Sequence, residues 1–80
     1  MSERLKFMGR RQELEIEKKN LEIRIRGLIS NIRDQADPLA KVEDLKTDAI
    51  VALSLELADA QDRLKEVLAE LKRIQDLLGR

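Results

Sequence analysis

The sequence predicts an all-α fold, an antiparallel two-helix hairpin of the coiled-coil type, in a single domain spanning residues 1–80. Apolar residues recur at alternating intervals of three and four in two long segments. The only proline lies in the break between these segments, where it interrupts helical hydrogen bonding. Charged residues make up 40% of the chain and aromatic residues 1%, a composition typical of long helices and not of a compact aromatic core.

The first periodic segment predicts a helix over about residues 3–35. Its heptad position d holds Phe7, Leu14, Leu21, Leu28 and Gln35, and its position a holds Arg4, Arg11, Lys18, Ile25 and Ile32. Positions a and d form the seam that faces a partner helix. The seam is therefore expected to be apolar at both positions only near residues 25–32 and half basic toward the N-terminus.

The break predicts a turn at about residues 36–38, followed by a second helix from about residue 38 to 79. Asp37 and Pro38 match a helix N-cap followed by a first helical residue. The apolar residues between 39 and 45, however, do not share the phase of the stripe that begins at Ile50. A kink near Lys46–Asp48, or a helix cap at Thr47, is the alternative interpretation.

The second periodic segment has the more regular seam. Position a holds Ile50, Leu57, Leu64, Leu71 and Leu78, and position d holds Leu53, Ala60, Val67 and Ile74. Nine consecutive seam positions are thus apolar, while the remaining positions carry many charged residues that favour a solvated helix face. This pattern predicts a long amphipathic helix.

Two other interpretations compete with the helical one. Residues 21–26 alternate between apolar and charged side chains, as a half-buried strand would, and Gly27 follows them. No other part of the chain alternates in this way, so a strand there would have no partner within the chain. The high charge also allows disorder, but disordered chains usually lack regularly spaced aliphatic residues.

Two long helices joined by a few residues are expected to fold back on each other. The residues predicted to form the intramolecular seam are Leu14, Leu21, Ile25, Leu28, Ile32, Ile50, Leu53, Leu57, Leu64, Val67, Leu71 and Ile74. The preferred register pairs positions whose numbers add up to 78, such as Leu14 with Leu64, because it uses the Asp37–Pro38 break as the turn. A sum of 85 is equally regular and requires a loop from about residue 36 to 48.

Apolar residues outside the seam predict self-association. Ile16 and Ile23 lie at heptad position f, and a second stripe is formed by Val51, Leu55 and Ala58. Contiguous exposed apolar surface usually marks a contact site. These five residues are candidate oligomer contacts, and the expected assembly is a four-helix bundle made of two hairpins. An unidentified protein partner is a further possibility.

The sequence contains little that supports catalysis, so an enzyme is not expected. There is no His and no Cys, which removes the usual general base, the usual thiolate nucleophile and most transition-metal ligands. The acidic groups around residues 13–22 and 43–48 are expected to be solvated helix faces and not metal sites. The three glycines are too dispersed for a phosphate-binding loop. No cofactor and no metal are therefore predicted.

A basic cluster at the N-terminus is the one candidate for a charged ligand. It consists of Arg4, Lys6, Arg10 and Arg11 and would suit phosphate groups of a nucleic acid or an anionic membrane surface. The alternative function is therefore an accessory protein of bacterial or phage type that binds one of these. Against it, the net charge of the chain is zero and no aromatic platform is present for stacking on bases.

The longest unbroken apolar run, residues 49–53, is far shorter than a membrane span, so a cytoplasmic location is the expectation. Helical hairpins of this kind occur in prefoldin-like chaperones, synthetase arms and small accessory proteins. No motif in the sequence identifies one of these families.

Overall fold

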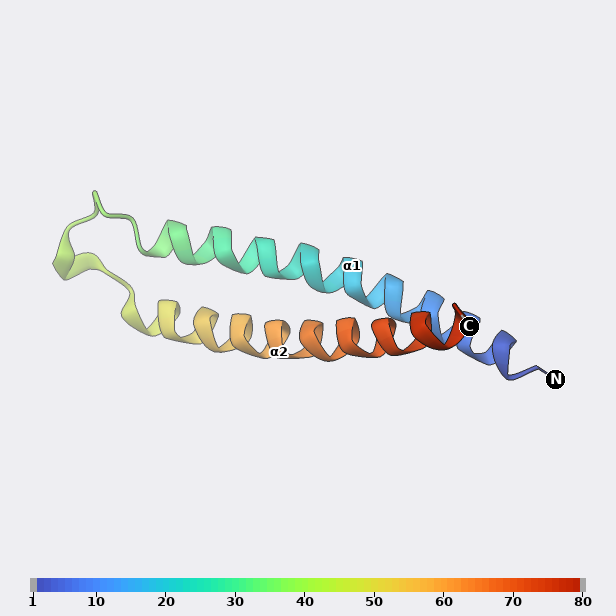
Figure 1. Ribbon diagram of the computed structural model, residues 1–80. Coiled ribbons are helices and arrows are strands. Elements are labelled where there is room, and N and C mark those ends of the chain that lie inside the picture. Colours follow the sequence, from blue (N-terminus) through green and yellow to red (C-terminus); the bar gives the residue numbers. More distant parts are fainter. Residues whose placement is uncertain (1, 80) are drawn as a thin grey trace.

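The computed structural model describes residues 2–79 and is an all-α helical hairpin, as the sequence predicts. Helix α1 runs over Glu3–Gln35 and helix α2 over Thr47–Leu78, with a short 3₁₀ turn, η1, at Val42–Asp44 between them. Figure 1 shows the two helices antiparallel and side by side, with the connecting loop at one end and both termini at the other. The hairpin measures 62 × 17 × 14 Å, so it is a rod and not a globule.

The bounds of α1 agree with the predicted range of about 3–35. The hydroxyl of Ser2 accepts a hydrogen bond from the backbone N–H of Arg4 at 3.1 Å and so caps the first turn. At the other end, the N–H of Ala36 donates to the carbonyl oxygen of Ile32, which completes the last turn. The segment 21–26, considered above as a strand, lies within α1.

The predicted start of the second helix is wrong, because α2 begins at Thr47 and not near residue 38. The predicted turn at 36–38 is correspondingly too short, and the connection runs from residue 36 to 46. The heptad of α2, extended backwards, would place Glu43 at position a and Lys46 at position d. The apolar stripe of this heptad therefore begins only at Ile50, close to the observed start of α2.

Asp37 forms a turn in place of the predicted helix cap. Its carboxylate oxygen accepts a hydrogen bond from the N–H of Leu39 at 2.9 Å, and its carbonyl accepts one from the N–H of Ala40 at 3.1 Å. A side chain that accepts from the second following N–H makes an Asx turn, which uses the same kind of bond as an N-cap. The Asp37–Pro38 pair therefore stops α1 and starts the loop.

The core shows which register the hairpin adopts. Leu14 packs in one buried cluster with Val67, Leu71 and Ile74, and Phe7, Leu21 and Leu78 pack against that cluster. The residues of α2 that share this cluster with Leu14 centre on Leu71, and Phe7 and Leu78 pack against the same cluster, which corresponds to a sum of 85. The preferred sum of 78 is therefore wrong, and the reason is the loop, whose extent of 36–46 is the one that the second register requires.

Burial along the seam is uneven. At the open end of the hairpin, Leu14 and Val67 are fully buried and Ile74 is 1% exposed. In the half next to the loop Leu28 and the small Ala60 are buried, whereas Ile25, Ile32, Leu53 and other seam residues there are half-buried. None of the twelve predicted seam residues is exposed. The chain therefore has a tightly packed open half and a loosely packed loop half.

Candidate interaction surface

The hairpin has two long edges that flank the seam, and they differ in chemistry. In a coiled coil, positions e and g lie beside the a/d seam. With α1 and α2 antiparallel, the g positions of both helices meet along one edge and the e positions along the other. The g edge is called the ion-paired edge below, and the e edge is called the open edge.

The ion-paired edge is bridged by two forked contacts between g positions. Arg63 donates from Nε and Nη2 to the two carboxylate oxygens of Glu17, the latter bond measuring 2.8 Å. Arg10 donates in the same way to Glu70, with N···O distances of 3.2 and 3.3 Å. Bidentate pairing of arginine with a carboxylate fixes geometry as well as charge. These bonds tie the two helices together along this edge.

The ion pairs shift the titration of their members. Hydrogen bonds from Arg63 lower the pKa of Glu17, and hydrogen bonds from Arg10 lower the pKa of Glu70, because both stabilise the ionised carboxylate. The same bonds raise the pKa of the two arginines. All four side chains are partly exposed, so each pair contributes modestly to stability and is screened by salt.

The open edge carries exposed aliphatic side chains where the other edge carries charges. At position e lie Met8 and Ile29 of α1 and Leu68 of α2, and at the neighbouring position b lie Val51 and Ala58 of α2; all five are exposed. The three side chains at position e are each slightly more than 40% exposed. The described residues form no ion pair between the helices along this edge. The open edge is therefore less tightly closed than the ion-paired edge.

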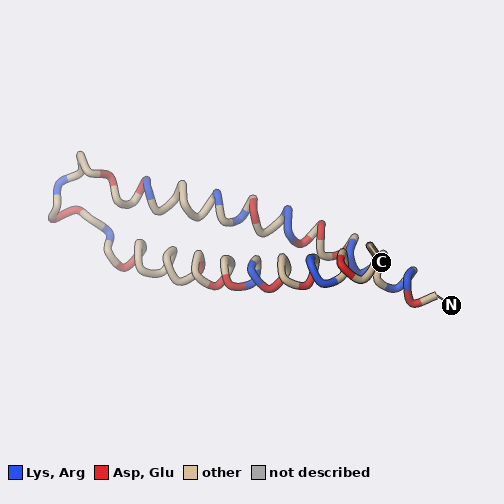
Figure 2. Tube along the Cα trace, viewed as in Figure 1, with Lys and Arg blue, Asp and Glu red and all other residues tan. Residues whose placement is uncertain are grey.

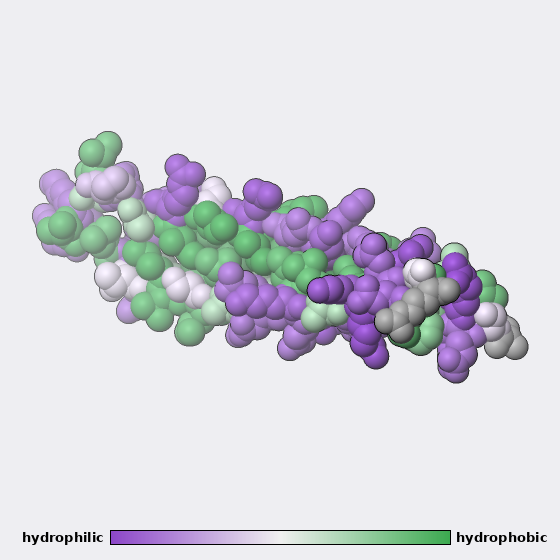
Figure 3. All heavy atoms as spheres, in the orientation of Figure 1, coloured by the Kyte–Doolittle hydropathy of each residue, from purple (hydrophilic) through white to green (hydrophobic). Residues whose placement is uncertain are grey.

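Two surface grooves lie along the open edge. One is lined by Glu22, Ile25, Arg26, Ile29 and Leu64, and the other by Arg4, Met8, Arg11, Gln75, Leu78 and Gly79. All of these residues occupy positions a, e or b. The half-buried seam residues of position a are therefore accessible from this side. Figure 3 shows one face of the molecule, on which hydrophobic side chains fill the groove between the helices over the loop half.

The loop half of α2 is especially poor in charge. Residues 49–55 contain no charged side chain, and Figure 2 shows the acidic and basic residues of α2 gathered mainly in its second half. This segment carries half-buried aliphatic residues at its seam and the exposed Val51 and Leu55 beside it, and contiguous exposed apolar surface usually marks a contact site. The open edge and the loop half therefore overlap in one apolar surface.

The five predicted oligomer contacts are all exposed, but they do not form one face. Val51 and Ala58 lie at position b on the open edge. Ile16, Ile23 and Leu55 lie at position f, which points away from the seam, and Ile23 is 70% exposed. Met8, Ile29 and Leu68 are not among the predicted contacts, although they lie on the open edge. The signal that identifies them is their place at e, directly beside position a.

The four residues of the predicted basic cluster are exposed, but two of them are already engaged. Arg10 binds Glu70 of α2 and Glu13 one turn further along α1. Arg4 donates a hydrogen bond to the carbonyl oxygen of Leu78 at 3.3 Å. Only Lys6 and Arg11 of the cluster have no hydrogen bond or ion pair among the described contacts. Fewer charges are therefore available for an anionic ligand than the sequence suggests.

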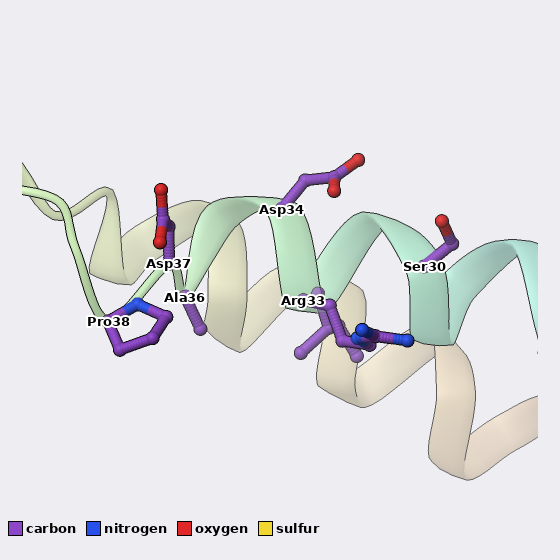
Figure 4. Close-up of a pocket in the computed structure, with 7 residues that line it drawn as sticks. Ser30, Arg33, Asp34, Ala36, Asp37 and Pro38 are labelled. Carbon is purple, nitrogen blue, oxygen red and sulfur yellow. The ribbon is translucent and has the colours of Figure 1, made fainter.

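The hollow at the loop end of α1 does not form a binding site. It is lined by Ser30, Ile32, Arg33, Asp34, Ala36, Asp37 and Pro38. Figure 4 shows that Ser30, Asp34 and Asp37 extend to one side of the ribbon while Arg33 extends to the other, so their polar groups do not converge. Among residues 2–79, no group of three or more acidic side chains is arranged to hold a metal ion.

Within the described part of the chain, neither helix contains a stretch long and apolar enough to cross a membrane. No family model, no curated protein and no solved structure matches the chain.

Proposed function

We propose that this chain is a non-enzymatic protein-interaction module that pairs with a second copy of itself through the open edge, forming a four-helix dimer. The observation that carries the proposal is the difference between the edges. One edge is closed by interhelical ion pairs, and the other presents aliphatic side chains beside a half-buried seam. An edge with this chemistry is suited to packing against another helix pair.

The amount of apolar surface supports the same proposal. Full burial of one aliphatic side chain is worth about 1.5–3 kcal/mol. Covering the exposed half of Met8, Ile29, Val51 and Leu68 would gain about 1 kcal/mol each on that scale, or about 8 kcal/mol for two copies. That exceeds the lower estimates of the cost of association, about 4 kcal/mol. A dimer that dissociates on dilution is therefore expected.

The experiment is analytical ultracentrifugation of the wild type and of edge variants over a range of concentrations. The wild type is expected to approach twice the chain mass of 9.2 kDa as concentration rises. The double variant I29K/L68K is expected to remain a monomer. In the monomer the long lysine stems can lie along the seam with their ammonium groups in water, but in the dimer those charges would be buried.

Leu77→Lys is the matched control, because Leu77 is a similarly exposed aliphatic residue at position g, on the ion-paired edge. This variant is expected to dimerise like the wild type. Circular dichroism of all variants checks that the helices persist. A wild type that stays at 9.2 kDa at every concentration overturns the proposal, and so does an I29K/L68K variant that dimerises as well as Leu77→Lys.

A further inference from the structure

We propose that the two copies in this dimer lie with their loops at the same end, with α1 of each copy packed against α2 of the other. This inference rests on the proposed function and adds the orientation of the partner. Self-association of small proteins is usually closed by a two-fold axis. For two hairpins stacked on their open edges, that axis runs either along the helices or across them.

The two axes give different neighbours. An axis along the helices keeps the loops together and places α1 over the partner's α2. An axis across the helices puts the loops at opposite ends and places each helix over the same helix of the partner. The orientation of the dimer therefore depends on whether α1 packs more favourably against the partner's α2 or against the partner's α1.

Charge favours unlike helices as neighbours. Helix α1, Glu3–Gln35, contains nine basic and six acidic residues, a net charge of +3. Helix α2, Thr47–Leu78, contains four basic and seven acidic residues, a net charge of −3. Packed helices lie about 8–10 Å apart, which is about one Debye length at physiological ionic strength. On the open edge itself, Glu15 and Glu22 lie at position e of α1 and Lys65 and Lys72 lie at position b of α2, so unlike helices as neighbours bring these carboxylates toward the ammonium groups of the partner.

The position of the apolar surface favours the same orientation. Most of the half-buried apolar seam residues lie toward the loop, among them Ile25 and Ile32 of α1 and Ile50, Leu53 and Leu57 of α2. Loops at the same end bring these two surfaces onto each other. With the loops at opposite ends and the rods in full overlap, each would meet the open half of the partner, where the seam residues Leu14 and Val67 are already fully buried.

The interface area would be too small in a shifted arrangement in which only the two loop halves overlap. A rod of 62 × 17 Å offers a face on the order of 1000 Å², against the ~800 Å² per partner of a standard interface. Overlap of half the length would leave on the order of 500 Å², below what stable complexes bury. Full overlap with the loops at the same end gives a large enough interface and also brings the apolar surfaces of the two copies together.

Distances between spin labels test this orientation. The chain contains no cysteine, so a single cysteine introduced by Ala40→Cys in the loop or by Asp76→Cys near the end of α2 carries one nitroxide label per copy. Both positions are exposed, and neither belongs to the open edge. Pulsed electron double resonance then measures the distance between the labels of the two copies, and ultracentrifugation checks that each labelled variant has the mass of the unlabelled protein.

Loops at the same end predict a short spacing, below about 35 Å, at both positions, because like helices then lie diagonally about 14 Å apart across the bundle. In any opposite-end dimer at least one spacing exceeds about 40 Å, since residues 47 and 76 are themselves about 44 Å apart along α2. A long spacing overturns the orientation and leaves the dimer intact. The absence of any dipolar signal overturns the dimer itself and the orientation with it.

Discussion

Shortening Leu14 to alanine should destabilise the hairpin more than the same change elsewhere, because Leu14 is fully buried among Val67, Leu71 and Ile74. The substitution removes three carbon atoms, worth about 2.4 kcal/mol at ~0.8 kcal/mol each. The surrounding side chains come from two long helices that cannot collapse easily into the space, so a cavity adds to this loss. Buried Leu→Ala changes cost about 2–5 kcal/mol in total, and about 3–4 kcal/mol is expected here.

The assay is thermal and urea unfolding followed by circular dichroism, with every variant at the same protein concentration because dimerisation would shift the midpoint. A loss of 3 kcal/mol corresponds to a fall in Tm of roughly 12 °C or more for a domain of this size. Leu39→Ala is the matched control, since Leu39 is 92% exposed in the loop. It should change stability by less than about 0.5 kcal/mol. Equal effects of the two substitutions would refute the assigned core.

Two further predictions concern the helix interior and the ion-paired edge. Gly27→Ala should raise the free energy of unfolding by about 0.5–1 kcal/mol, because glycine is a poor helix former and an added Cβ at this site meets no atom within 4 Å; a lower Tm would contradict this. Acid should weaken the hairpin as pH falls below about 4.5, the ordinary pKa of glutamate, because Glu17 and Glu70 titrate at a lower pKa in the folded state. The double variant E17Q/E70Q should lose part of this pH dependence in melts between pH 3 and 7, and an unchanged profile would show that these pairs do not report on folding.

The helical fold, the extent of α1 and the identity of the seam follow from the sequence because each depends on local periodicity. The start of α2 does not, since Asp37 makes the same hydrogen bond in an Asx turn as it would at a helix cap. The signal that separates them is the heptad of the later seam, which places the charged Glu43 and Lys46 at positions a and d and becomes apolar only from Ile50. That information lies in the packing of α2 and not in the Asp37–Pro38 pair.

The register of the hairpin could not be predicted from the heptad pattern alone either. A shift of one heptad places leucine opposite leucine again, so Leu14 finds an apolar partner in either Leu64 or Leu71. Only the length of the loop separates the two arrangements, and that length depends on the start of α2. The error in the helix boundary therefore caused the error in the register.

The candidate surface was predicted in part. Exposed aliphatic residues at Val51 and Ala58 were identified, but the open edge becomes visible only when the ion pairs are known to occupy the opposite side. The sequence shows complementary charges at the g positions, yet it does not show which of them meet. Arg10 was assigned to a ligand-binding cluster for this reason, whereas in the structure it is bound to Glu70.

The tight packing at the open end has a consequence for how the chain folds. When the best contacts of a hairpin lie close to its turn, they form as soon as a short loop closes and offset the entropic cost of closing it. Here the most buried side chains are Leu14, Val67 and Ile74, which are far apart in the sequence, and the seam residues next to the loop are less buried. Formation of each helix should therefore precede their docking, and the rate of docking should depend on helices that are already long before they meet.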